Sequence, residues 1–268
     1  MREEINQVAP ILPPMDGIAA RPASRIGHAV WVRVTHWFIV ASVLTLVVSG
    51  LAILVAHPRI YWGQAGNSLM TPLVELPWGP NYHNIPFGSA MHFFGAGGPV
   101  SQPRLQEPVN LNGWARSLHF IVGWTLSFSL GAYLVAALLS GHFIRWLLPS
   151  KAELAPANIK ADLQAHLSFR PPSTNGGPPY NLLQKLSYLG VAFVALPVMV
   201  ITGLAMSPAM TATFPFLMDI TGGYQSARTV HFFMMCLIVV FLIAHLAMMV
   251  LTGFGRQLHT MTVGRRRI

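Results

Sequence analysis

Long apolar segments alternate with polar connections along this chain. Four of the segments contain no Asp, Glu, Lys or Arg, and they are 22, 25, 21 and 27 residues long. A helix of about 20 residues is long enough to cross the hydrocarbon core of a bilayer. The pattern therefore predicts four membrane-spanning helices, over residues 34–55, 117–141, 186–206 and 229–255.

The positions of these segments predict how the chain is organised. Every backbone polar group of a spanning segment must be satisfied within the protein, which favours a compact helix bundle. We expect an all-α membrane protein, a four-transmembrane-helix bundle formed by residues 28–255. It has an outer connection at residues 56–113 and an inner one at 142–181, and it lies between tails at residues 1–27 and 256–268.

The distribution of basic residues predicts the orientation of the bundle. Cytoplasmic connections of membrane proteins carry an excess of Lys and Arg. With the N-terminus inside, thirteen of the 17 Lys and Arg residues fall on the cytoplasmic side. We therefore expect both termini, including the basic tail, to be cytoplasmic. The four that fall outside are Arg59, Arg104, Arg116 and Arg228.

Composition supports a membrane protein and excludes several other classes. Only 9% of the residues are charged, whereas soluble domains carry about 25%. The net charge of +9 follows from topology, so we expect residues 265–267 to meet lipid headgroups and no nucleic acid to bind. Cys236 is the single cysteine, which excludes an intramolecular disulfide and an iron–sulfur cluster held by several cysteines. Residues 1–27 lack the apolar core of a cleaved secretory signal.

An Arg-x-x-His motif occurs three times, each time near the start of an apolar segment. Residues three apart on a helix share a face, so each copy places an imidazole within the membrane and a guanidinium one turn nearer the water. Haem requires both groups: nitrogen ligands for the iron and cations for the propionates. The three copies are Arg33 with His36, Arg116 with His119, and Arg228 with His231.

A fourth histidine, His245, completes two pairs. It follows His231 by fourteen residues, which is roughly 21 Å along a helix axis and a rotation of about 320°, so both lie near one face. With the predicted orientation, His119 and His231 lie near the outer surface, and His36 and His245 near the cytoplasm. The sequence thus predicts two bis-histidine haems b, one above the other across the bilayer.

The arginines of the motif have two interpretations. Arg33, Arg116 and Arg228 are expected to bind haem propionates, which would offset the cost of a cation at a helix N-terminus. Alternatively, they are interfacial anchors. Gly50 lies fourteen residues after His36, near the level of the outer pair, where a missing side chain would leave room for a porphyrin.

The remaining histidines give weaker signals. His28 and His142 lie near the cytoplasmic ends of their segments and would replace His36 if the predicted depths are wrong. His57, His83 and His92 fall in the outer connection. Three histidines could bind a metal there, but their spacing is not a known ligand pattern, and ordinary loop or interface positions explain them better.

The motifs together resemble a known family. The residues that carry the likeness are His36-Trp37 and the segments 112–119, 180–185, 204–208 and 226–231. They are similar to the bacterial cytochrome b561 group, which includes the cytochrome b subunits of nickel–iron hydrogenases, formate dehydrogenases and thiosulfate reductase-like enzymes. The resemblance covers roughly residues 25–255 and implies two b haems, paired as above. It also implies an inner-membrane subunit that passes electrons between a periplasmic catalytic subunit and the quinone pool.

Two finer expectations rest on this resemblance. The long outer connection and its segment 58–62 are most similar to versions that serve molybdopterin oxidoreductases, so we expect such a partner rather than a hydrogenase. The family's quinone site lies beside the inner haem, at the start of the third span. Here that position holds Tyr180, Asn181, Gln184 and Lys185. Asn181 and Gln184 also have the spacing of a helix capping box, which is the alternative interpretation.

Other functions remain open at this point. A stand-alone superoxide, quinone or ferric oxidoreductase would use the same haems without a partner. A metal or proton transporter would use the histidines directly, although the broken helices and internal repeats typical of transporters are not evident apart from Pro197. A purely structural anchor would hold a partner without reacting with quinone.

Overall fold

The computed structural model describes residues 28–67, 69–76, 92–93, 113–167 and 181–264. Within these ranges the chain is mostly helical, and four helical segments are long and apolar enough to cross a membrane. This confirms the number of spans expected from the sequence. The segments are α1 (Val30–Ala56), α3 (Gly113–Leu139), the consecutive helices α5 (Leu182–Leu189), η3 (Gly190–Ala195) and α6 (Leu196–Ala205), and α9 (Tyr224–Leu251).

Each span begins four or five residues before the predicted start. The predicted segments excluded all charged residues, whereas Arg33, Arg116, Lys185 and Arg228 each lie in the first turns of a helix. Long basic side chains can extend along the helix to the polar interface, so one such residue does not end a span. The fourth helix ends at Leu251 rather than at residue 255 because Gly253 has a φ of +101°, in the left-handed region.

The third span changes helix type in its middle. The segment η3 is a π-helix, and Pro197 lies in the first turn of α6 directly after it. Proline lacks the amide proton and crowds the preceding turn, so the regular hydrogen-bond ladder cannot continue through it. Wider π turns relieve this conflict and often occur near functional sites.

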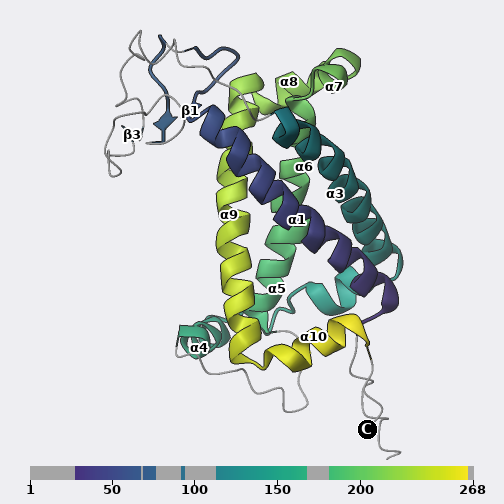
Figure 1. The fold of residues 1–268 in the computed structure, drawn as a ribbon. Helices are drawn as coiled ribbons and strands as arrows, with labels where there is room; N and C mark the ends of the chain where they lie inside the picture. Colours follow the sequence, from purple (N-terminus) through teal and green to yellow (C-terminus); the bar gives the residue numbers. More distant parts are fainter. Residues whose placement is uncertain (1–27, 68, 77–91, 94–112, 168–180, 265–268) are drawn as a thin grey trace, which may run out of the picture.

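The spans pack as two closely associated pairs, α1 with α3 and α6 with α9, and Figure 1 shows α1 crossing in front of α6 and α9. All four spans contribute to a buried apolar cluster, while large apolar side chains elsewhere on the helices are exposed, as expected where lipid covers them. The cluster consists of Leu46, Leu126, Leu130, Ala195, Leu196 and Ile238.

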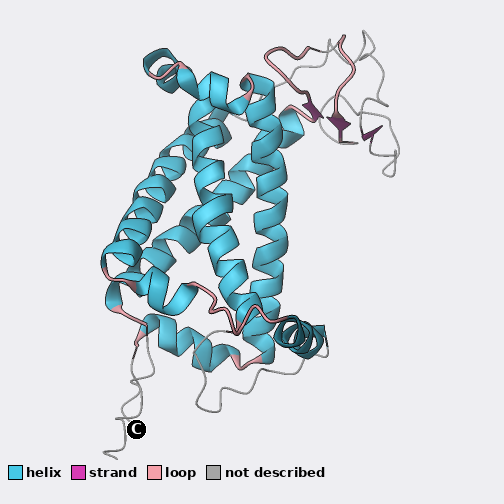
Figure 2. Cartoon of the chain, turned by 180° about the vertical axis from the view of Figure 1, so that it is seen from behind, coloured by secondary structure: helices cyan, strands magenta, loops and turns pink. Residues whose placement is uncertain are grey.

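One end of the bundle carries a small sheet and two short helices (Figures 1 and 2). The chain is mostly helical, as expected, and the outer connection adds short antiparallel strands in the order β1-β2-β3. Strands of two residues leave no alternating pattern for sequence reasoning to detect. The elements are β1 (Arg59–Ile60), β2 (Val74–Glu75), β3 (His92–Phe93), α7 (Pro208–Thr213) and α8 (Phe216–Thr221).

The opposite end carries three helices that the sequence analysis did not predict. The inner connection contains η2 (Phe143–Leu147) and α4 (Pro156–Leu167), and the C-terminal part forms α10 (Phe254–Thr262). Figure 1 places α4 and α10 at the foot of the bundle, beside the beginnings of α1 and α5. This end is the one predicted to face the cytoplasm.

Candidate functional site

The structure brings His119 of α3 and His231 of α9 together near the end of the bundle that carries the sheet. Their ring centroids are 6.2 Å apart and their planes are inclined by 59°. The two rings approach each other from different helices, as the predicted pairing requires.

Each of these histidines contacts a hydroxyl group from one of the other two spans, α1 or the span that contains α6. Ser49 Oγ of α1 lies 2.9 Å from Nδ1 of His119, and Thr202 Oγ1 of α6 lies 2.9 Å from Nδ1 of His231. All four spans therefore meet at this site, two supplying imidazoles and two supplying hydroxyl groups.

A glycine follows each hydroxyl residue and lies against the ring. A Cβ atom on Gly50 would lie 3.3 Å from Cε1 of His119, and one on Gly203 would lie 3.5 Å from Cε1 of His231. Gly50 is thus at the level of the outer pair, as the sequence predicts. The same two-residue unit, a hydroxyl residue and then glycine, supports both imidazoles.

This geometry fits a metal held between two imidazoles. A metal–imidazole bond is about 2 Å long, so two such bonds in line, with the half-width of each ring, span about 6 Å between centroids. The observed centroid separation of 6.2 Å matches that span. A bare ion requires more ligands than two, and no group of three or more His, Cys, Asp or Glu able to hold one occurs among the described residues. A porphyrin supplies the remaining ligands itself, and a chain with one cysteine has no Cys-x-x-Cys-His attachment motif.

Two of the predicted propionate arginines gather at the outer end of the bundle. Arg228 donates a hydrogen bond to the backbone oxygen of His57, and Arg116 lies 5.6 Å from the centroid of the Phe120 ring. Burial lowers the pKa of His57, and the nearby Arg228 and Arg116 lower it further. The two cations therefore form one positive region, which suits anionic groups at the edge of a haem.

The inner histidines lie on α1 and α9 at the other end of the bundle. His36 interacts electrostatically with His245, and His245 stacks on Phe241 with ring centroids 5.7 Å apart. The Nδ1 atom of His36 is buried and has no hydrogen-bond partner in the part of the chain that the structure describes. Two imidazoles from different spans are thus close enough to interact, which makes this pair the candidate site of the second haem.

The alternative inner histidines, His28 and His142, lie near the start of α1. His142 makes an edge-on contact with Trp31, with ring centroids 5.6 Å apart. Burial lowers the pKa of His28, and His142 and Arg33 lower it further, which places these groups close together. His28 is thus near His142, and His36 interacts more strongly with His245 than with His28.

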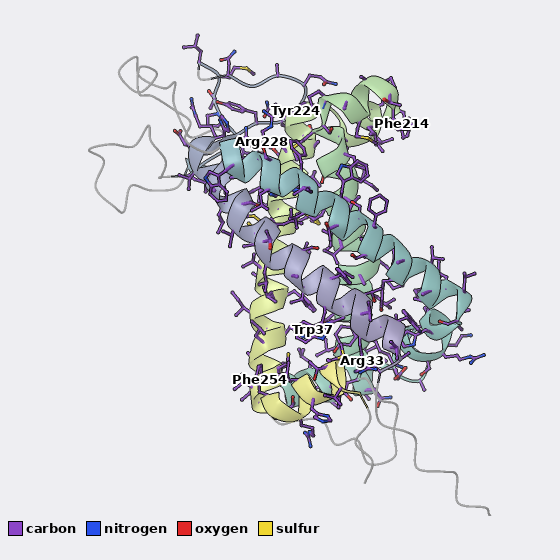
Figure 3. All side chains as sticks on the ribbon, turned by 45° about the vertical axis from the view of Figure 1, so that its right-hand side comes forward. Arg33, Trp37, Phe214, Tyr224, Arg228 and Phe254 are labelled. Atoms are coloured by element: carbon purple, nitrogen blue, oxygen red, sulfur yellow. The ribbon has the colours of Figure 1, made fainter. Side chains whose placement is uncertain are left out.

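Arg33 is engaged by the C-terminal helix. Its Nη1 donates to the backbone oxygen of Thr262 at 2.8 Å, and Trp37 Nε1 donates to the backbone oxygen of Met261 at 3.0 Å. Figure 3 shows Arg33 and Trp37 at the foot of α1, far from Arg228 and Tyr224 at the other end. Arg33 Nε is buried without a partner among the described residues, so part of its guanidinium remains available to an anion.

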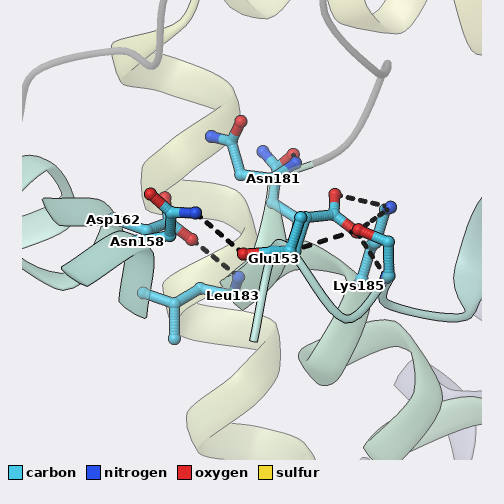
Figure 4. A network of polar contacts seen from close by, with 9 residues as sticks. Glu153, Asn158, Asp162, Asn181, Leu183 and Lys185 are labelled. Carbon is cyan, nitrogen blue, oxygen red and sulfur yellow. Dashed lines mark hydrogen bonds and ion pairs between the residues drawn. The ribbon is translucent and has the colours of Figure 1, made fainter. Parts of the chain in front are cut away.

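The predicted quinone residues occupy the start of the third span (Figure 4). Tyr180 lies outside the described residues. Gln184 Oε1 accepts from the backbone nitrogen of Asn181 at 3.2 Å, within a capping box. Asn181 Nδ2 is buried and makes no hydrogen bond in the described part of the chain. The capping interpretation therefore holds for both side chains, while Asn181 Nδ2 remains a free donor among the described residues.

Sequence reasoning missed the residue that pairs with Lys185. Lys185 Nζ lies 2.8 Å from Oε1 and 2.9 Å from Oε2 of Glu153, which belongs to the inner connection. This hydrogen bond lowers the pKa of Glu153. Asp162 of α4 also accepts from the backbone nitrogen of Leu183 at 2.8 Å. No periodic pattern links these segments, so only the fold reveals the contact.

The sheet at the outer end is attached to the beginning of α9. Gly63 N donates to Ser226 Oγ at 2.8 Å, and Thr229 Oγ1 donates to the backbone oxygen of Tyr61. Arg59 and Glu75 face each other across the strands, with Nε and Oε1 3.5 Å apart. The connection is therefore anchored two residues from His231, and it presents exposed Trp62 beside this anchor.

Comparison with known proteins identifies the family of the chain. The family model for prokaryotic cytochrome b561 matches residues 27–264. The chain is also 30% identical over 227 residues to a protein of Azospira oryzae described as a putative protein-methionine-sulfoxide reductase subunit, YedZ1. That match covers 84% of this chain and 90% of the relative. No solved structure matches the chain significantly.

Proposed function

The chain belongs to the prokaryotic cytochrome b561 family, and from that premise we propose that it is a diheme subunit connecting a periplasmic oxidoreductase with the quinone pool. Members of the family are integral membrane electron-transfer proteins that bind b-type haem. The observation that carries the proposal is the pair His119–His231, whose centroids are 6.2 Å apart at one end of α9, together with His36 and His245 at the other. Haems bound at both pairs would supply reversible one-electron chemistry near each face of the membrane.

The residues of the chain hold, orient and enclose these sites. His119 and His231 provide the outer ligands, His36 and His245 the inner ones, and the helices around them exclude water. Arg116 and Arg228 would neutralise propionates at the outer end, and Arg33 would do so at the inner end. The buried cluster of apolar residues lies between the two levels, which keeps the sites separate and their surroundings apolar.

We place the quinone at the cytoplasmic start of α5, the region of Tyr180, Asn181, Gln184 and Lys185. Two features support this position. Asn181 offers a buried amide nitrogen, Nδ2, without a hydrogen-bond partner among the described residues, and Lys185 is buried and bonded to Glu153. The Glu153 side chain is 21% exposed whereas that of Lys185 is 7% exposed, so the pair connects a buried group with water and could pass protons.

The periplasmic partner is proposed to dock on the end that carries the sheet. Trp62 is 62% exposed and Leu69 is 72% exposed there, and aromatic side chains are enriched at the centres of protein interfaces. The Azospira oryzae relative is described as a subunit of a putative reductase, which supports an oxidoreductase as the partner. A molybdopterin enzyme is our choice because of the resemblance of segment 58–62 and the outer connection.

Purification of the tagged full-length chain tests this function. We expect two b haems per chain, reduction of both by a quinol, and co-purification of a periplasmic protein that contains molybdenum. A preparation without haem would overturn the proposal and favour a transporter. A haem-containing chain that isolates alone and reacts with superoxide or ferric chelates would identify a stand-alone oxidoreductase, and failure to react with quinol would indicate a structural anchor.

A further inference from the structure

The hydroxyl groups beside the outer histidines donate their protons to backbone oxygens. Ser49 Oγ donates to the backbone oxygen of Thr45 at 2.9 Å, one turn earlier in α1. Thr202 Oγ1 donates in the same way to the backbone oxygen of Val198 at 2.7 Å in α6. A carbonyl oxygen cannot donate, and a hydroxyl group has one proton. In both places the hydroxyl oxygen is therefore left as an acceptor.

This determines which ring nitrogen of each histidine carries the proton. Because Ser49 Oγ and Thr202 Oγ1 accept, the proton of each contact is assigned to the Nδ1 atom of His119 or His231, 2.9 Å away. A neutral imidazole carries one proton, so Nε2 of each ring retains its lone pair. A metal binds that lone pair, and metal-ligating histidines commonly donate their other N–H group to a neighbouring acceptor.

We propose that Ser49 and Thr202 are positioning residues for the outer haem, and that Gly50 provides the space in which the His119 imidazole is held. The hydroxyl groups select the tautomer and fix the rotation of His119 and His231. The inference rests on the proposed function, because it assigns these residues to a haem held by that histidine pair.

The inner site differs in the hydrogen bonding of its histidines. His36 Nδ1 is buried without a hydrogen-bond partner among the described residues. A hydrogen bond donated by Nδ1 makes an imidazole a stronger electron donor and so stabilises ferric over ferrous iron. The outer hydroxyl groups therefore lower the potential of the outer haem, whereas the His36 side of the inner haem lacks this effect.

Redox titration of the purified full-length protein tests the proposal through the haem spectrum. We expect Ser49→Ala and Thr202→Val each to raise the midpoint potential of one haem and to leave that of the other haem unchanged. The affected haem should be the same one in both variants. Thr202→Ser should restore the wild-type value because it keeps the hydroxyl group. His119→Ala, which removes an outer ligand, identifies the haem that is lost as the outer one.

Ser127→Ala and Thr125→Val are matched controls. Both hydroxyl groups donate to a backbone oxygen one turn earlier in α3, at 2.8 Å and 3.2 Å, but neither forms a hydrogen bond with a histidine among the described residues. These variants should match wild type at both haems. Selective loss of the outer haem in Ser49→Ala or Thr202→Val also supports the proposal.

Unchanged potentials and full haem content in Ser49→Ala and Thr202→Val would overturn the inference, as would equal shifts of both haems. Such results would leave the diheme function standing. A wild-type protein without haem would instead overturn the proposed function, and with it this assignment. The two failures are therefore distinguishable in one set of samples.

Discussion

Lys185 and Glu153 form an ion pair in which the two partners differ in burial. The nitrogen–oxygen distance is 2.8 Å, and the side chains are 7% and 21% exposed. Because Lys185 lies at the start of the third span and Glu153 in the inner connection, the pair joins that connection to the bundle. The Glu153 carboxylate is therefore partly hydrated, whereas the Lys185 ammonium group is largely shielded from water.

The unequal burial predicts unequal effects of removing each partner. Glu153→Ala leaves a buried cation unpaired and should destabilise the protein by roughly 1–3 kcal/mol, below the range for a fully buried pair. Lys185→Met leaves a carboxylate that remains partly hydrated, so its effect should be smaller. Thermal unfolding in detergent measures both, and a larger loss in Lys185→Met would contradict the assignment of burial.

The same pair predicts a dependence of stability on acid. The hydrogen bond from Lys185 lowers the pKa of Glu153 below its ordinary value of 4.5. A group whose pKa is depressed on folding contributes stability that is complete above the unfolded value and is lost as pH falls through the folded one. The difference in melting temperature between wild type and Glu153→Gln should therefore be constant from about pH 6 to 8 and shrink below about pH 4.5. A difference that grows with acid would contradict it.

The two glycines beside the outer histidines should not tolerate alanine equally. On Gly50 the added Cβ would lie 3.3 Å from His119, which forces the ring to move, whereas on Gly203 it would lie 3.5 Å from His231, an ordinary contact. Gly50→Ala should therefore weaken outer haem binding, and Gly203→Ala should change it little. Haem content after purification and washing distinguishes them, with Gly123→Ala, which meets nothing within 4 Å, as the control.

The pairing of histidines predicts the haem content of single variants. His36→Ala and His245→Ala should each retain one haem per chain with the same spectrum and potential, because both remove a ligand of the inner site. A pyridine haemochrome assay gives the content. His142→Ala should retain two haems, since His142 contacts Trp31; loss of one haem there would instead assign the inner iron to the His28–His142 group.

Gly223 should be essential for attaching the outer sheet. Its φ is +109°, and an added Cβ would lie 2.6 Å from the backbone oxygen of Gly63. Gly223→Ala should cost about 1–3 kcal/mol and release the connection from α9, making residues near Gly63 sensitive to protease. Gly190→Ala, where nothing lies within 4 Å, is the control. Equal cleavage of Gly223→Ala and wild type would show that the attachment does not depend on this glycine.

The sequence by itself determined the membrane architecture and the candidate haem ligands. Four uncharged runs of at least 21 residues have no other stable arrangement than helices in a bilayer. The fourteen-residue spacing of His231 and His245 is a property of one helix, so depth and face follow from helical geometry. Such regularities can be read from the sequence because they depend only on residues of the same helix.

Only the tertiary structure decided what surrounds those ligands. Ser49 and His119 are 70 positions apart, and Glu153 and Lys185 are 32 apart; neither contact has a period or spacing that a sequence would display. The strands of the outer connection are stabilised by pairing rather than by their own two residues. Side chains brought together by packing of separate helices are specified by the whole bundle, so the hydroxyl groups that orient the outer histidines became visible only in the fold.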